Sequence, residues 1–240
     1  MFRSGNPALM GDIFGRDAAV SERVMTIQGT VNKTLVLLLI ATVTASWVWA
    51  EPITRGGLVL PAAILGFITA LVTVFNKKAA HISAPLYALF EGVVLGGISA
   101  IFEAKYPGIV IQAVALTFGT LFCLLMAYKS GAIKPTENFK LGVFAATGAV
   151  ALIYIVSMIM GFFGASIPMI HDSGPVGIGF SLIVVAIAAL NLVLDFDFIE
   201  KGAEKRAPQY MEWYGAFGLM VTLVWLYLEL LRLLAKTRNR

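Results

Sequence analysis

Apolar residues along this chain gather in seven long runs that are separated by short polar connections. The runs cover residues 34–50, 57–75, 84–102, 109–128, 141–163, 176–195 and 213–235. Each has roughly the 17 to 25 residues that a helix needs to cross a bilayer core of about 30 Å. Backbone groups in lipid must be satisfied internally and no alternating strand pattern is present, so helices are predicted. The pattern therefore predicts an all-α integral membrane protein with seven transmembrane helices.

The connections leave no room for a separate soluble domain. Residues 1–33 are predicted to form a cytoplasmic N-terminal tail, 34–235 a seven-helix transmembrane domain and 236–240 a short basic C-terminal tail. Residues 13–27 are predicted to form a short amphipathic helix on the membrane surface. Composition agrees with a membrane protein: 59% of residues are hydrophobic and 13% charged, against about 45–50% and 25% in soluble domains.

Lys and Arg residues gather on one side of the predicted bundle. The N-terminal tail and the second, fourth and sixth connections hold most of them, whereas the other connections hold only Arg55 and Lys105. Cytoplasmic loops carry such an excess, so the N-terminus is predicted to be cytoplasmic. The basic residues after the seventh run depart from this rule. Topology and anionic lipid explain the net charge of +4, and no nucleic-acid partner is expected.

Carboxylates within the predicted helices are the candidate functional residues, because a charge at the centre of a bilayer costs at least about 2.5–3.5 kcal/mol. Glu91 lies seven residues into the third run, about 10 Å from its end. It should face the interior of the bundle. Two interpretations stay open for Glu91: a protonated acid hydrogen-bonded to a neighbouring helix, or a cation or proton site.

The end of the sixth run holds two aspartates. Asp195 ends the run, and Asn191 lies one turn before it on the same helix face. We expect Asp195 and Asn191 to face inward together. Asp197 lies about 200° further round the helix, so it is expected to face the membrane interface and to pair with Lys201 at i+4.

Two carboxylates that lie close together would share a proton or be bridged by a metal ion. Oxygen ligands suit Ca²⁺ or Na⁺, and the sequence has no cluster of His or Cys that would favour zinc or copper. The predicted pH sensor or cation site consists of Asp195, Glu91 and Asn191, with Asp197 as a weaker candidate. No resident cofactor is expected, and calcium is expected only as a transported ion.

Other patterns have simpler explanations. Gly92 and Gly96 have the small-xxx-small spacing that lets two helix backbones approach closely. Glu229 is expected to form a local ion pair with Arg232 at i+3. No nucleophile elbow, zinc-protease motif or phosphate-binding glycine loop is present, so the chain is not expected to be an enzyme.

Several stretches resemble a known family. Residues 192–234 read LVLDFDFIEKGAEKRAPQYMEWYGAFGLMVTLVWLYLELLRLL: an acidic residue near the end of the sixth helix, a short charged connection with an Ile-Glu, and an aromatic start to the seventh helix. Residues 6–9 read NPAL, residues 29–34 GTVNKT and residues 88–99 ALFEGVVLGGIS. Together they resemble a bacterial branch of the Bax-inhibitor (transmembrane Bax inhibitor motif) family.

The resemblance implies six helices wrapped around a central seventh, in a pH-sensitive calcium leak of a bacterial cell inner membrane. In that family two aspartates, one each in the sixth and seventh helices, form the sensor. Asp195, or else Asp197, corresponds to the first. Residues 218–222 hold no carboxylate for the second, and residues 57–75 hold no Arg for the family's latch. Glu91 is the candidate for the missing partner of Asp195.

Two classes of function are therefore predicted as alternatives. The first is a pH-sensitive cation (calcium) leak channel or exchanger, gated by protonation of intramembrane carboxylates, with the lipid bilayer and calcium or protons as partners. The second is a non-conducting regulator that binds another membrane protein, such as a membrane-anchored protease or stress factor.

Overall fold

The computed structural model describes residues 24–164 and 172–239. Seven of its helices are long and apolar enough to cross a membrane, which confirms the predicted class. The amphipathic helix predicted over 13–27 and the motif at 6–9 lie mainly or wholly outside the described residues. The long helices are α2 Ile27–Ala50, α4 Val59–Phe75, α5 Ala80–Lys105, α6 Ile109–Lys129, α7 Glu137–Phe162, α9 Pro175–Glu204 and α10 Tyr210–Arg238.

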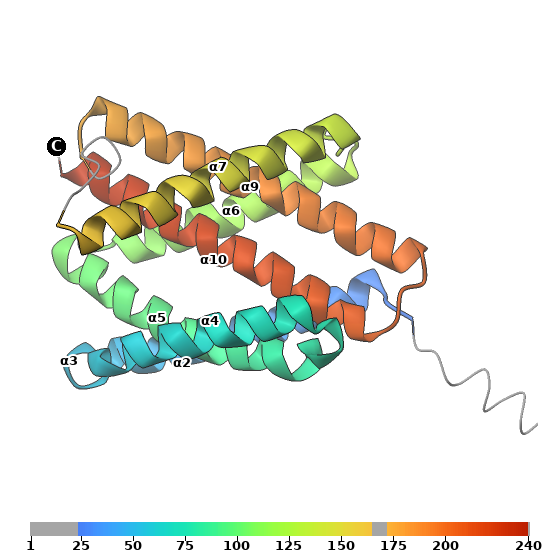
Figure 1. Ribbon diagram of the computed structural model, residues 1–240, viewed down its shortest axis with the longest axis horizontal. Helices are drawn as coiled ribbons and strands as arrows, with labels where there is room; N and C mark the ends of the chain where they lie inside the picture. Colours follow the sequence, from blue (N-terminus) through green and yellow to red (C-terminus); the bar gives the residue numbers. More distant parts are fainter. Residues whose placement is uncertain (1–23, 165–171, 240) are drawn as a thin grey trace, which may run out of the picture.

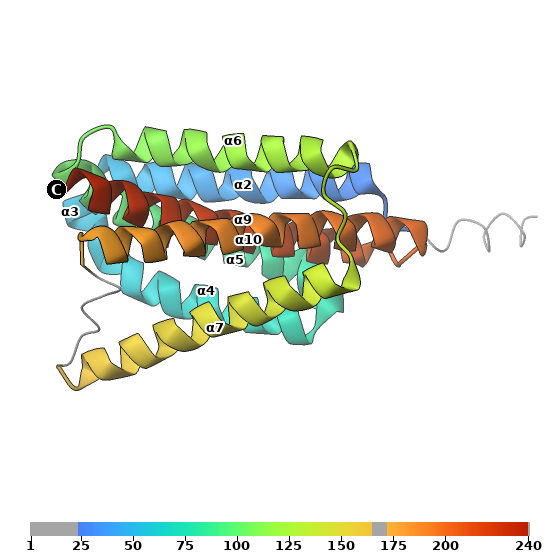
Figure 2. The same ribbon diagram turned by 90° about the horizontal axis from the view of Figure 1, so that it is seen from above.

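Helix α10 is the centre of the bundle, as the family resemblance implied (Figure 1). It packs directly against α2, α5, α6 and α9, while α4 packs chiefly on α5 and α7 chiefly on α9. In its most apolar stretch of 18 residues, 61% of α10 is buried, against 11% of α7. Figure 2 shows α7 leaning away from the other helices along part of its length. The bundle therefore has a packed centre and one loosely attached helix.

Both predicted tail boundaries differ from the helix ends. Helix α2 begins at Ile27, because the Thr26 side chain caps it by accepting a hydrogen bond from the Gly29 N–H at 2.9 Å. Its first turns are polar and so give no hydropathy signal. Helix α10 continues to Arg238, and Lys236 within the predicted C-terminal tail is buried.

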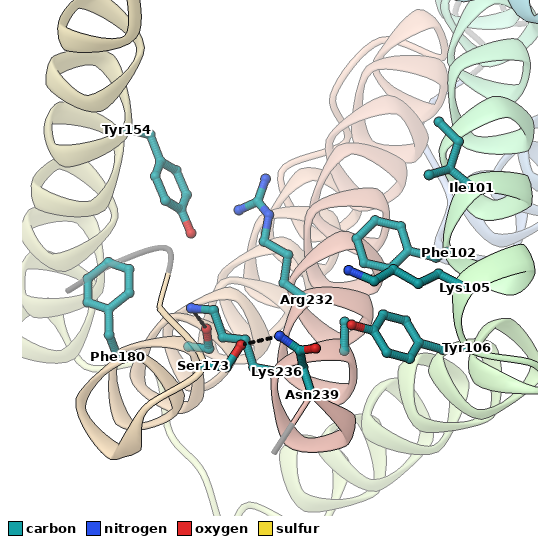
Figure 3. Close-up of a pocket in the computed structure, with 12 residues that line it drawn as sticks. Ile101, Phe102, Lys105, Tyr106, Tyr154, Ser173, Phe180, Arg232, Lys236 and Asn239 are labelled. Carbon is teal, nitrogen blue, oxygen red and sulfur yellow. Dashed lines mark hydrogen bonds between the residues drawn. The ribbon is translucent and has the colours of Figure 1, made fainter. Parts of the chain in front are cut away.

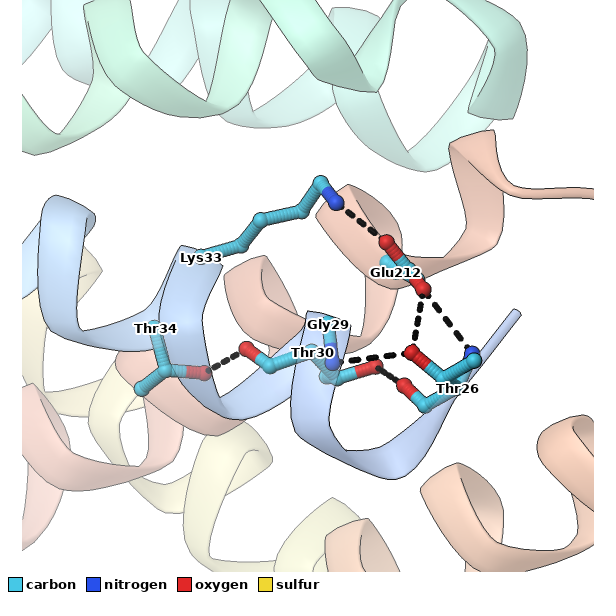
Figure 4. Close-up of polar contacts among 6 residues, drawn as sticks. All are labelled: Thr26, Gly29, Thr30, Lys33, Thr34 and Glu212. Carbon is cyan, nitrogen blue, oxygen red and sulfur yellow. Dashed lines mark hydrogen bonds and ion pairs between the residues drawn. The ribbon is translucent and has the colours of Figure 1, made fainter. Parts of the chain in front are cut away.

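A polar clasp ties the start of α2 to the start of α10 (Figure 4). The Glu212 carboxylate accepts hydrogen bonds from the backbone N–H and the hydroxyl of Thr26, both at 2.8 Å, and pairs with Lys33. Beside the clasp, the Met25 N–H donates to the Ala207 carbonyl at 2.7 Å. Glu212 is only 2% exposed, so these donors replace the water that a carboxylate would otherwise need.

The small residues of α5 lie against α2, as their spacing predicted. A Cβ on Gly92 would lie 2.8 Å from the Cα of Ala41, and a Cβ on Gly96 would lie 2.9 Å from the Cα of Ala45. Ala41 and Ala45 are themselves four residues apart, so each helix presents small residues to the other. The two backbones are in contact along this face.

Adding a methyl group at this contact should separate the helices. We expect Gly96→Ala to lower the free energy of unfolding by about 1–3 kcal/mol, seen as a melting temperature several degrees lower in detergent. Gly119→Ala is the control, because a Cβ at Gly119 on α6 meets no atom within 4 Å. Equal melting temperatures for the two variants would contradict the close contact.

Candidate functional site

Asp195 lies on α9 where this helix packs against α10. Its Oδ1 atom is 3.8 Å from the position that a Cβ on Gly218 would occupy, and the Thr222 side chain lies near the carboxylate. Its Oδ2 atom is buried and has no hydrogen-bond partner in the described part of the chain. Gly218 and Thr222 lie one turn apart on α10, so they present one face to the carboxylate. The small side chain of Gly218 leaves room for Asp195.

Asp195 lies well inside α9 and not at its end. It lies nine residues before Glu204, the last residue of α9, which corresponds to about 14 Å along the axis. Asp195 faces residues 218–222 of α10, the stretch that holds no carboxylate. The residue that α10 places beside Asp195 is therefore a threonine and not a second carboxylate.

Glu91 is directed elsewhere. Its Oε2 atom is 3.8 Å from the position of a Cβ on Gly66 of α4, and Tyr87, one turn earlier on its own helix, lies near it. The ring of Tyr87 packs edge-on against Phe217 of α10, with centroids 5.1 Å apart. Glu91 thus faces α4 while Asp195 faces α10, and among the described residues no contact joins the two carboxylates.

Asn191 also makes contacts different from those expected. Its side-chain amide donates to the Thr147 hydroxyl on α7 at 2.8 Å and to the Ile187 carbonyl at 2.9 Å. It shares a helix face with Asp195 in sequence, but its amide turns toward α7 while the carboxylate lies against α10. The predicted trio of Asp195, Glu91 and Asn191 is therefore spread over contacts with three different helices. In the described part of the chain, no group of three or more His, Cys, Asp or Glu residues could hold a metal ion.

Asp197 forms the predicted ion pair with Lys201, at 2.8 Å, and a second pair with Lys140 of α7, at 3.0 Å. The aspartate is only 9% exposed. The local partner follows from the i+4 spacing, whereas the second partner depends on which helices touch. Asp197 therefore connects α9 to α7 as a structural charge.

Glu229 forms the predicted pair with Arg232, at 2.8 Å. It is far more buried than a local pair near the interface requires, with 1% exposure. The Tyr154 hydroxyl on α7 donates to its Oε1 atom at 2.9 Å, and its Oε2 atom has no hydrogen-bond partner among the described residues. Glu229 therefore joins α10 to α7, a role that local spacing did not indicate.

One polar face of α7 carries all three of these contacts between helices. Lys140, Thr147 and Tyr154 recur every seven residues, and their partners are Asp197, Asn191 and Glu229. The three positions span about 21 Å of helix, which is most of a bilayer core of about 30 Å. The seven-residue spacing was available in the sequence and is the signal that could have found this face.

The fold and these carboxylates define a multi-pass α-helical membrane protein with acidic residues buried around a central helix. The model of the family described as Bax inhibitor 1 like matches residues 6–239, nearly the whole chain, and the protein belongs to this family. A comparison with curated proteins finds no match.

The ion pairs of Lys140 offer a test of how α7 is attached. We expect Asp197→Asn to lower the free energy of unfolding by about 1–3 kcal/mol and to speed amide hydrogen exchange in residues 137–147, because a mostly buried partner is lost. Glu137→Gln is the control: Glu137 also pairs with Lys140, at 2.9 Å, but its side chain is 88% exposed. An exposed pair contributes about 0–1 kcal/mol. Similar exchange rates in both variants would contradict a structural role for Asp197.

Proposed function

We propose that this protein is a pH-sensitive cation leak of a bacterial inner membrane, with Asp195 as the residue whose protonation controls flux. Family membership supports a membrane protein of the Bax-inhibitor family. The cation, Ca²⁺ or a proton, is the transported substrate. It would move beside the polar face of α7, between α7, α9 and α10.

The observation that carries this proposal is the environment of Asp195. Three buried carboxylates have a basic partner: Glu212 has Lys33, Asp197 has Lys140 and Lys201, and Glu229 has Arg232. Within the described residues Asp195 has no ion pair, and one of its oxygens has no hydrogen-bond partner. An ionised carboxylate in this position attracts a mobile cation, and a protonated one does not.

The attachment of α7 supports this route. Its burial is the lowest among the seven long helices, and its contacts with α9 and α10 include the polar pairs at Lys140, Thr147 and Tyr154. Polar groups at this depth favour a path for ions or protons over a surface that only faces lipid. Small movements of α7 would change the width of the path without disturbing the packing of α10.

The proposed orientation places the N-terminus in the cytoplasm. The clasp at Glu212 and the basic cluster at Lys140 and Lys201 then lie on the cytoplasmic side, together with the connections richest in Lys and Arg. Asp195 lies nearer this side and Glu229 nearer the opposite side, since each is nine residues from the corresponding helix end.

Calcium flux into dye-loaded liposomes tests the role of Asp195. For the wild-type protein we expect severalfold greater flux at pH 8 than at pH 6, because the aspartate loses its negative charge as pH falls. Asp195→Asn should give low flux with little pH dependence. Glu91→Gln is the matched control, since Glu91 is also an intramembrane carboxylate but faces α4.

Three results would overturn parts of this proposal. Full pH dependence in Asp195→Asn would remove Asp195 as the sensor. Loss of pH dependence in Glu91→Gln would restore Glu91 to the sensor. No flux of calcium, sodium or protons in any folded variant would remove the leak and leave the non-conducting regulator that binds another membrane protein.

A further inference from the structure

A basic pocket lies near the C-terminal end of α10, whereas the clasp lies at the start of that helix. Figure 3 shows residues that line the pocket. Its volume is about 440 Å³, and its lining includes Lys105 of α5, Arg232 and Lys236 of α10, Tyr154 of α7 and Ser181 of α9. Four helices therefore contribute to one cavity. The volume falls within the range of about 300–1,000 Å³ typical of small-molecule sites.

Neighbouring groups hold two of the three cations in place. Arg232 pairs with Glu229 at 2.8 Å. The Lys236 ammonium donates to the Gly177 carbonyl at 3.0 Å and to the Ser181 hydroxyl at 2.8 Å, and its side chain is only 9% exposed. Basic side chains near a helix end commonly extend to the interface to reach water, but Lys236 is instead buried against α9. The pocket thus contains positive charge fixed by the fold.

Lys105 completes the basic lining from a different helix. Its ammonium lies 5.2 Å from the centroid of the Tyr106 ring, and it forms no ion pair with a carboxylate in the described ranges. Among the described residues, Arg232 pairs with Glu229, and Glu229 and Asp172 are the carboxylates that act on Lys236. Three cations against two carboxylates leave an excess of positive charge around the pocket.

Hydrogen-bond donors and a helix end add to this charge. Ser173 and Asn239 line the pocket and are hydrogen-bonded to each other at 3.1 Å. Helix α9 begins at Pro175, so the positive end of its dipole lies beside the Ser173 wall. Charged and neutral donors around one cavity are the groups that bind an oxyanion.

We propose that this pocket binds a phosphate group, either the headgroup of an anionic lipid or a free phosphate. Arg232 and Lys105 would contact the phosphate oxygens, and Lys236 would contribute charge from the wall. A bound phosphate would offset the positive charge at this mouth of the bundle. The site is separate from Asp195, so it does not depend on the proposed leak.

Binding of inorganic phosphate to the full-length protein in detergent tests whether the pocket binds a free phosphate. At constant ionic strength we expect a saturable rise in melting temperature, about 3 °C when phosphate is tenfold above its dissociation constant. Lys105→Gln should weaken the apparent affinity at least threefold, because this side chain is exposed and its loss leaves Glu229 paired. Lys78→Gln is the control: it removes the same charge from an exposed lysine on the connection between α4 and α5.

A second experiment tests whether the pocket binds a lipid headgroup. The protein is extracted from vesicles of phosphatidylglycerol and phosphatidylcholine, and the lipids that stay bound are identified by native mass spectrometry. Selective retention of phosphatidylglycerol that Lys105→Gln reduces and Lys78→Gln does not would assign a lipid headgroup. A phosphate-dependent melting shift without lipid retention would assign a free phosphate. Absence of both signals, or equal losses in Lys105→Gln and Lys78→Gln, would overturn the proposal, and neither readout depends on ion flux.

Discussion

A carboxylate inside a membrane is stable only where neighbouring helices supply a positive charge or a hydrogen-bond donor. In this bundle such groups join α10 to α2, and α7 to α9 and α10. Glu212 ties α10 to α2 through Thr26 and Lys33, while Asp197 and Glu229 tie α9 and α10 to α7. Apolar packing supplies most of the contact area between helices. Lipid tails are as apolar as these side chains, however, so apolar contact alone does little to select one neighbouring helix over another. The acidic residues therefore give the arrangement much of its specificity.

The sequence indicates features that depend on spacing and misses those that depend on which helices meet. Apolar length was sufficient to place all seven spans, and spacing was sufficient for the pairs at Lys201 and Arg232. Thr147 and Tyr154 were missed as partners because each contact crosses between helices. The expected closeness of Glu91 and Asp195 rested on depth alone. The depth of a residue along its helix does not determine which neighbouring helix its side chain faces.

The threonine opposite Asp195 changes the pH response that this site can give. Two facing carboxylates would titrate as a coupled pair, with two proton steps that belong to the pair and not to either residue. Asp195 beside Thr222 takes up a single proton, since a hydroxyl does not ionise near neutral pH. A gate built on this residue would therefore have one titration step, whereas a gate built on two facing aspartates would have two steps at different pH values.

The central position of α10 has a consequence for how the protein is made. It is the last of the seven helices in the chain, yet α2, α5, α6 and α9 all pack against it. Until α10 enters the membrane, the earlier helices lack their common surface, and the Ser99 hydroxyl lacks the Tyr227 partner that it meets at 2.7 Å. Insertion of individual helices and their later association are separable stages in membranes. In this protein the packing around α10 can therefore form only in the second stage, once α10 has joined the six long helices that precede it.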